Sequence, residues 1–204
     1  MRSLFFLLIL SSSLFAVDVS DFEIKGIKLG MSKKEVLKKM PCTNPKTNVY
    51  KIEGKLVWSE FSCKLDKNSY DPDFHVMLNQ HNRVIYIDRT KRFNVTPLWE
   101  KVKQNLLNHY GSKGVQSINK NNVAPFQLCW GECVTKNSGK FFDPFIEEGQ
   151  PLLNIEAYYN IGYKPYMTFI FTNPTKSKEN KEWKELLEKK EEEHKREKAS
   201  NIDF

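Results

Sequence analysis

The stretch from Gly26 to Pro41 reads Gly-Ile-Lys-Leu-Gly-Met-Ser-Lys-Lys-Glu-Val-Leu-Lys-Lys-Met-Pro and predicts a short helix with both ends marked. Ser32 is a natural N-cap. Glu35 lies three residues later, where its carboxylate can reach back to the Ser32 amide as in a capping box. Pro41 ends the helix, because the residue before a proline is driven out of the α region. Between these ends lies one apolar stripe, formed by Val36, Leu37 and Met40.

An antiparallel meander is predicted to follow this helix, because apolar and polar residues alternate with the period of a strand. The alternation places Trp58 on the face opposite Phe61 and Cys63. Turn signals at Glu53-Gly54 and at 79–82 separate the strands. The predicted strands are Asn48–Ile52, Lys55–Leu65, Phe74–Leu78 and Val84–Ile87.

A second helix, with residues that mark both its start and its end, is predicted at the beginning of the other half of the chain. Thr96 is its predicted N-cap, Pro97 its first residue, and Gly111 lies just past its end. Leu98, Val102, Leu106 and Tyr110 recur every four residues and form its apolar stripe. The predicted strands that follow are Phe126–Trp130, Leu153–Tyr159 and Tyr166–Thr172, with a long loop at Lys136–Gln150.

A helix followed by antiparallel strands, found twice, predicts an α+β fold with two helix-plus-antiparallel-sheet units in tandem. The first unit spans residues 17–92 and the second 93–175. After Pro174 the composition changes to Lys and Glu, so residues 176–204 predict a charged C-terminal helix. Trp183, Leu186 and Leu187 are the apolar residues that can attach its first turns to the body of the protein.

The N-terminus has the pattern of a secretory signal peptide. Arg2 precedes an apolar run at Leu4–Leu10, and Ala16 offers a cleavage position. Residues 1–16 are therefore expected to be removed, and the mature protein is expected in the periplasm or outside the cell. No cysteine follows the cleavage position closely, since the first is Cys42, so a stable membrane anchor is not expected.

The net charge of +7 is compatible with nucleic acid, anionic lipid or acidic polymers as partners. Export makes nucleic acid the least expected of these, and the basic residues are scattered along the sequence.

Four cysteines in an exported chain are most simply two disulfides, with three possible connectivities. Cys42–Cys63 with Cys129–Cys133 is favoured, because each pair lies within one half of the chain. Gly131 allows the turn that the second pair needs. The C-x3-C spacing is not the C-x-x-C of a thiol oxidoreductase.

The segment at 26–36, Gly-Ile-Lys-Leu-Gly-Met-Ser-Lys-Lys-Glu-Val, and the sheet predicted after it resemble a superfamily of small envelope proteins. Its members include the outer-membrane assembly lipoproteins (SmpA/OmlA, or BamE) and the secreted β-lactamase inhibitory proteins. The resemblance implies a helix packed on an antiparallel sheet, two such units in the inhibitors, and binding of another protein through the exposed sheet face without catalysis. This chain lacks the lipid-attachment cysteine of the assembly lipoproteins.

The sequence indicates no catalytic, cofactor or metal site, because its histidines and serines lack the spacings that such sites need. Aromatic residues on predicted strands are the alternative signal, since Tyr and Trp dominate protein-binding hot spots. The candidate partner-binding residues are Trp58, Tyr86, Tyr158 and Tyr166. The leading hypothesis is an exported, non-enzymatic protein-binding or envelope-assembly module whose partner is another envelope or secreted protein. The alternatives are a secreted inhibitor of a hydrolase and an enzyme acting on envelope polymers.

Overall fold

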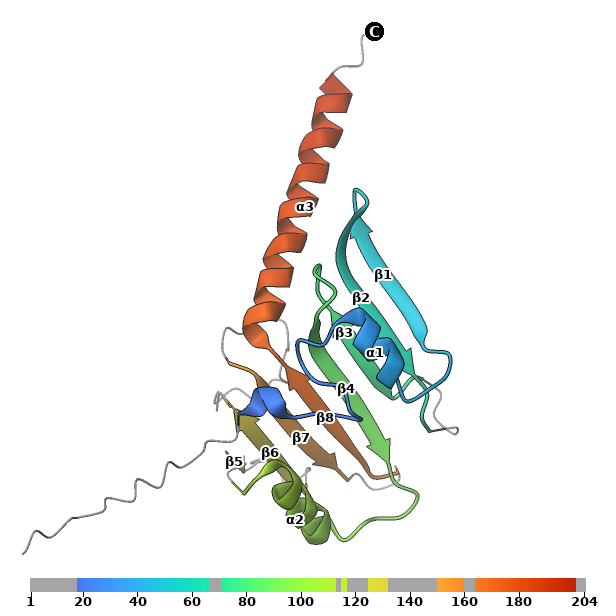
Figure 1. Cartoon of the computed structure of the whole chain (residues 1–204), viewed down its shortest axis with the longest axis vertical. Helices are drawn as coiled ribbons and strands as arrows, with labels where there is room; N and C mark the ends of the chain where they lie inside the picture. Colours follow the sequence, from blue (N-terminus) through green and yellow to red (C-terminus); the bar gives the residue numbers. More distant parts are fainter. Residues whose placement is uncertain are drawn as a thin grey trace, which may run out of the picture.

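The protein has an α+β fold, as predicted (Figure 1). The structure is a computed structural model that describes residues 18–66, 71–112, 115–116, 125–131, 150–159 and 164–200. The predicted signal peptide lies outside the described residues. No described helix is long and apolar enough to cross a membrane. The helices are the 3-10 helix η1 (Val19–Asp21) and the α-helices α1 (Lys33–Lys39), α2 (Trp99–Tyr110) and α3 (Pro174–Ser200).

The described strands form a single antiparallel sheet in the order β1-β2-β3-β4-β8-β7-β6-β5. First-half strands occupy one side of this sheet and second-half strands the other, and the pairing of β4 with β8 joins them. The strands are β1 (Lys46–Ile52), β2 (Lys55–Cys63), β3 (Phe74–Leu78), β4 (Val84–Arg92), β5 (Val115–Gln116), β6 (Phe126–Gly131), β7 (Leu152–Tyr158) and β8 (Tyr166–Thr172).

The first predicted helix is confirmed, with both hydrogen bonds of the Ser32–Glu35 capping box present. The residues before it attach it to the sheet. Gly30 N–H donates to Val84 O (2.8 Å) and Val84 N–H to Met31 O (2.9 Å), at the start of β4. These bonds place α1 over the first half of the sheet. The predicted apolar stripe is only partly right, because Val36 is fully buried whereas Leu37 is 45% exposed.

The second predicted helix begins later than expected. Its N-cap is Leu98, with no side-chain hydrogen bond, and not Thr96, so Pro97 lies outside the helix. Packing of Trp99 against the core explains the shift, because its ring lies edge-on against both Phe93 and Phe126. That packing leaves Leu98 outside the apolar stripe and 77% exposed. The predicted end is confirmed, because Gly111 is the C-cap with a φ of 99°.

One face of the sheet carries the main core. Figure 1 shows α1 and α2 on this same face, with the segment between η1 and α1 crossing in front of β4 and β8. The buried side chains of the central strands alternate with the strand period. The fully buried aromatic rings and aliphatic chains of this core include Phe61, Phe74, Val76, Ile87, Leu153, Ile155 and Phe171.

The predicted Cys42–Cys63 disulfide is confirmed, with a Cα–Cα distance of 5.9 Å. It links the segment after α1 to the end of β2. Cys129 on β6 is also disulfide-bonded. Its expected partner, Cys133, lies outside the described residues. Gly131, two residues after Cys129, has a φ of 91°, and the Pro151 carbonyl approaches it so closely that a side chain at this position would clash.

The helix α3 packs on the β1–β2 hairpin. Leu187 is fully buried with Ile52 and Val57, and Trp183 packs against this group. The Trp183 indole N–H also donates to Leu56 O (3.0 Å). Leu186, in contrast, is 44% exposed.

The predicted strand bounds agree with the structure for some strands and differ for others. β8 has the predicted bounds, whereas β4 continues to Arg92, five residues beyond the predicted end. The two-residue strand β5 was not predicted. The predicted loop at Lys136–Gln150 lies almost wholly outside the described residues.

Candidate partner-binding face

The second face of the sheet lies opposite α1 and α2, and we call it the polar face. Strand register defines it, because residues that pair across neighbouring strands point to the same side. One row crosses from Ser62 through His75, Asp88 and Ile170 to Asn154. The next row contains Glu60, Met77 and Tyr86. The side chains of this face are half-buried for the most part, as expected for large residues standing on a sheet.

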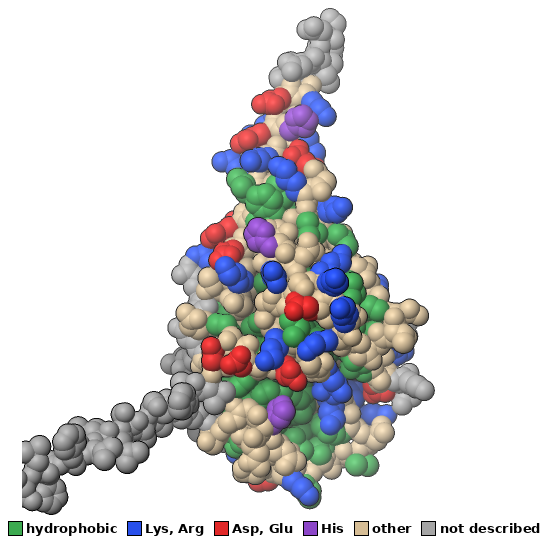
Figure 2. Space-filling view, viewed as in Figure 1, with side chains coloured by type: hydrophobic (Ala, Val, Ile, Leu, Met, Phe, Trp, Pro, Cys, Tyr) green, Lys and Arg blue, Asp and Glu red, His purple; other side chains and the backbone are tan. Residues whose placement is uncertain are grey.

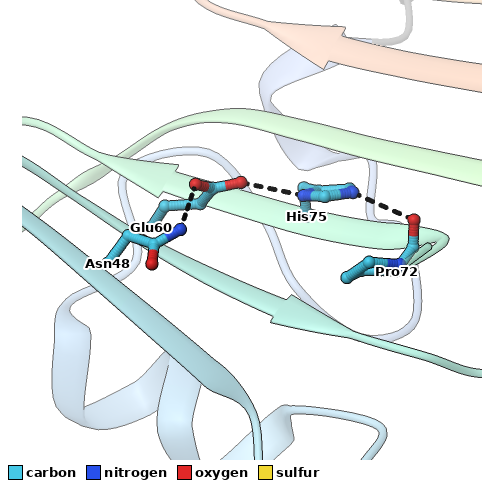
Figure 3. A network of polar contacts seen from close by, with 4 residues as sticks. All are labelled: Asn48, Glu60, Pro72 and His75. Carbon is cyan, nitrogen blue, oxygen red and sulfur yellow. Dashed lines mark hydrogen bonds and ion pairs between the residues drawn. The ribbon is translucent and has the colours of Figure 1, made fainter.

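A hydrogen-bonded network connects the first three strands on the polar face (Figure 3). His75 Nδ1 lies 2.8 Å from Glu60 Oε1, and His75 Nε2 lies 3.2 Å from Pro72 O. Asn48 donates from Nδ2 to the other carboxylate oxygen of Glu60 (3.1 Å). Both ring nitrogens of His75 therefore face oxygen acceptors, and both contacts are hydrogen bonds only when the imidazole carries both protons.

Asp88, paired with His75 across the β3–β4 ladder, is the least satisfied polar group of this face. Its Oδ1 atom is buried and has no hydrogen-bond partner among the described residues. Burial raises the pKa of Asp88 above the ordinary value of an aspartate, and the charge of His75 partly offsets this effect. Burial also raises the pKa of the Tyr86 hydroxyl, with further contributions from Asp88 and Glu60. The centre of the polar face thus holds a carboxylate with one buried oxygen to which no described residue donates.

Two predicted binding residues, Tyr158 and Tyr166, form a stacked pair at another part of the polar face. They are cross-strand neighbours on β7 and β8, with ring centroids 4.6 Å apart and ring planes 14° apart. The Tyr158 hydroxyl donates to Glu156 Oε2 (2.6 Å). Burial and this carboxylate raise the pKa of Tyr158, so its hydroxyl stays protonated at neutral pH. The pair presents a rigid aromatic surface, because each ring restrains the other.

Trp58, a predicted candidate, is on the polar side of β2 but already has a partner within the chain. Its ring lies 5.7 Å from that of Tyr50. Both rings pack against the cluster that anchors α3. A change at Trp58 would therefore disturb the attachment of α3, and this residue is a poor probe of partner binding.

The four predicted aromatic residues share a face but do not form one cluster. Tyr86 and Tyr166 are separated along the strand direction, because Tyr166 pairs with Arg92, six residues beyond Tyr86. At the rise of a strand this is about 20 Å. Between the aromatic groups lie the charged residues that the sequence reading did not select, Glu60, His75 and Asp88. The alternation of β2 could have indicated Glu60, which is two residues from Trp58.

Basic residues that are scattered along the sequence lie close together at one place in the folded protein. A wide hollow of about 750 Å³ lies beside α1 on the helix-covered side, and it is lined by Lys33, Lys34, Lys38 and Arg83 together with Leu37 and polar residues. Figure 2 shows Lys and Arg side chains concentrated in the region of α1. The residues come from α1 and the β3–β4 turn, which the Gly30 and Met31 hydrogen bonds hold together.

Within the described part of the chain, no group of three or more His, Cys, Asp or Glu residues is placed to hold a metal ion. Asp73, a loop carboxylate of the kind that acid–base chemistry uses, accepts from the amides of Leu65 (2.6 Å) and Asp66 (2.8 Å). It therefore supports the backbone. Comparisons with protein-family models, curated proteins and solved structures give no match to this chain.

Proposed function

We propose that this chain is an exported, non-enzymatic protein-binding or envelope-assembly module that holds a partner protein on the polar face of its sheet. Asp88 carries the proposal. Asp88 Oδ1 is buried and has no donor among the described residues, which destabilises the free protein, and a donor that a partner brings to the partly exposed Asp88 side chain would offset part of that penalty. A Lys, Arg or hydroxyl group of the partner has the required chemistry.

The aromatic residues supply the second component of such an interface. Tyr158 and Tyr166 offer a restrained apolar surface with polar edges, which is the usual composition of interface hot spots. Tyr86 lies beside Asp88 on the same strand. An interface over these residues would combine an aromatic contact at β7–β8 with a charge contact at β4.

The sheet order supports two units in tandem, with proposed spans 17–92 and 93–175. β1 to β4 accompany α1, β5 to β8 accompany α2, and the last strand of each half meets at the β4–β8 pairing. This arrangement agrees with what the resemblance to the small envelope proteins implies. We further propose that residues 1–16 are a cleaved signal peptide, that the partner is another envelope or secreted protein, and that residues 176–204 form a charged helical spacer.

A secreted inhibitor of a hydrolase is the second candidate, because the same polar face would serve it. The two functions differ in the class of protein that is bound and in the effect of binding on that protein's activity. An inhibitor would bind one hydrolase tightly and stop its activity. An envelope module would bind a structural or assembly protein. Neither described hollow is lined by an Asp or Glu residue, so an enzyme acting on envelope polymers has less support.

The proposal is tested by capture from an envelope extract with mature, oxidised protein as bait. Asp88→Ala and Tyr166→Ala alter the two components of the polar face separately, and Leu98→Ala is the matched control, being an exposed apolar residue at the start of α2. Loss of a hot spot weakens binding by about 2 kcal/mol, or roughly thirtyfold. We expect a specific protein to be retained by wild type and Leu98→Ala and lost from the other two variants.

Equal retention by all four baits would place the contact elsewhere and contradict the proposal. Thermal unfolding of each variant shows that it is folded before its capture is scored. Assaying the captured protein for hydrolase activity, with and without the bait, then separates an inhibitor from an assembly module.

A further inference from the structure

A hollow of about 410 Å³ lies on the helix-covered side of the sheet, between α2 and the central strands β4 and β8. It is separate from the polar face, because its sheet residues have the opposite strand parity. Its volume falls within the range of sites that enclose a small ligand. The walls are mainly apolar and include Phe93, Val102, Leu106, Met167 and Phe169.

Arg89 lines this hollow from β4, and its side chain is half-buried. Its guanidinium carbon lies 5.6 Å from the centroid of the Phe169 ring. Among the described residues the guanidinium makes no ion pair and no hydrogen bond to a carboxylate. Burial lowers the pKa of Arg89, with smaller opposing contributions from Tyr110 and Asp73. The Asp73 carboxylate, as described above, is already occupied by two backbone amides.

The other charged and polar groups around Arg89 add to the positive character of the hollow. Lys91, two residues along the same strand, has its ammonium 5.1 Å from the Phe93 ring centroid. His109 and Tyr110 complete the α2 side, and the Tyr110 hydroxyl donates to Glu23 O (3.2 Å). No Asp or Glu lines the hollow among the described residues. Apolar walls together with the half-buried guanidinium of Arg89 complement a ligand that has an apolar chain and a negatively charged head group.

We propose that this hollow binds a small amphipathic anion, a carboxylate with an apolar chain, whose head group pairs with Arg89 and whose chain lies along Leu106 and Phe169. Guanidinium and carboxylate match in geometry and form two parallel hydrogen bonds. The cation is already partly desolvated before the ligand arrives, so pairing is stronger than at a fully water-exposed arginine. The apolar chain replaces water against the aliphatic and aromatic walls.

The test is isothermal titration of the whole mature protein with octanoate. Octanol, which has the chain without the charge, and acetate, which has the charge without the chain, are the ligand controls. Arg89→Gln removes the cation. Arg92→Gln is the matched control, because it makes the same change three residues along β4 and on the opposite face. A charge-assisted contact of this kind corresponds to about 10- to 100-fold in affinity.

We expect octanoate to bind with one molecule per chain, Arg92→Gln to bind as wild type does, and Arg89→Gln to bind about 10- to 100-fold more weakly. Leu106→Trp, which fills the hollow from α2 and leaves Arg89 intact, should abolish binding while the protein still unfolds cooperatively. Absence of octanoate binding to wild type would overturn the proposal. So would octanol binding as tightly as octanoate, or equal affinities in the Arg89 and Arg92 variants.

Discussion

Two neighbouring residues on β4, Asp88 and Arg89, have partly buried charged groups, and neither forms an ion pair with another described residue. They point to opposite faces of the sheet, Asp88 into the polar face and Arg89 into the hollow under α2. Buried charges are normally paired, because removing them from water is unfavourable. A strand that carries two such residues gives up stability in the free protein. We interpret both as sites where an external group completes the interaction.

At the residue scale, Asp88→Asn should stabilise the free protein at neutral pH. Burial raises the pKa of Asp88 in the folded state, so the folded protein holds that proton more tightly than the unfolded chain does. The contribution of Asp88 to the unfolding free energy is thus fully present below the ordinary carboxyl pKa. It is lost as the pH rises through the raised pKa that Asp88 has in the folded protein. The neutral amide avoids this loss. We expect a gain in unfolding free energy on the order of 1 kcal/mol at pH 7.

The measurement is urea denaturation of wild type and variant across acidic to neutral pH. The difference should shrink as pH falls below the ordinary carboxyl pKa, because Asp88 is then protonated in both states. Asp21→Asn, which changes an exposed carboxylate in η1, corrects for the general effect of removing a negative charge. A variant less stable than wild type at pH 7, after this correction, would show that the Asp88 carboxylate is satisfied in the free protein.

At the element scale, α3 is a long polar helix held by few apolar contacts. Pairs four residues apart, such as Lys184–Glu188 (3.5 Å) and Lys195–Glu191 (2.8 Å), contribute a few tenths of a kcal/mol each. The attachment to the β1–β2 hairpin depends on Leu187 and Trp183. The position of α3 therefore depends on one short contact region.

Trp183→Ala should detach α3 from the hairpin without unfolding the sheet. The change removes the hydrogen bond from the indole N–H to Leu56 O and the packing of the ring against Ile52 and Val57. For a half-buried tryptophan with one hydrogen bond, we expect a loss of about 2 kcal/mol. Hydrogen exchange should show faster exchange of amides in α3, with the core strands β3 and β4 unchanged. Leu186→Ala, at an exposed position of the same turn, is the control. Uniformly faster exchange in the sheet would mean that α3 and the sheet unfold as one unit.

Local signals predicted single elements well where the deciding interactions are themselves local. The capping box at Ser32 involves residues three positions apart, and the alternation of β2 assigned Trp58 to the correct face. The start of α2 was missed because a distant contact, Trp99 against Phe126, outweighs the capping preference of Thr96. Propensity is a weak guide when tertiary packing opposes it.

At the scale of the whole molecule, one sheet separates two surfaces with different chemistry. The helix-covered side holds the core and two hollows that each include basic residues in their linings, and the other side holds Tyr86, Tyr158 and Tyr166 with Glu60 and Asp88. The pairing of Ile87 with Phe171 creates this arrangement by joining strands that are far apart in the sequence. Sequence periodicity indicates which residues share a strand face, but it does not contain the register between distant strands. The grouping of Asp88 with Ile170 and Asn154 was therefore not predictable.

The central claim, that a partner protein binds the polar face, is tested most directly by site-specific photo-cross-linking in cells that export the protein. A photoreactive phenylalanine analogue would replace Asn48 or Tyr166 on the polar face, and as controls Lys101 in α2 or Leu98, the N-cap of α2. We predict that both polar-face positions form an adduct with the same protein and that neither α2 position does. Adducts formed at the α2 positions alone, or at all four positions with equal yield, would contradict the account.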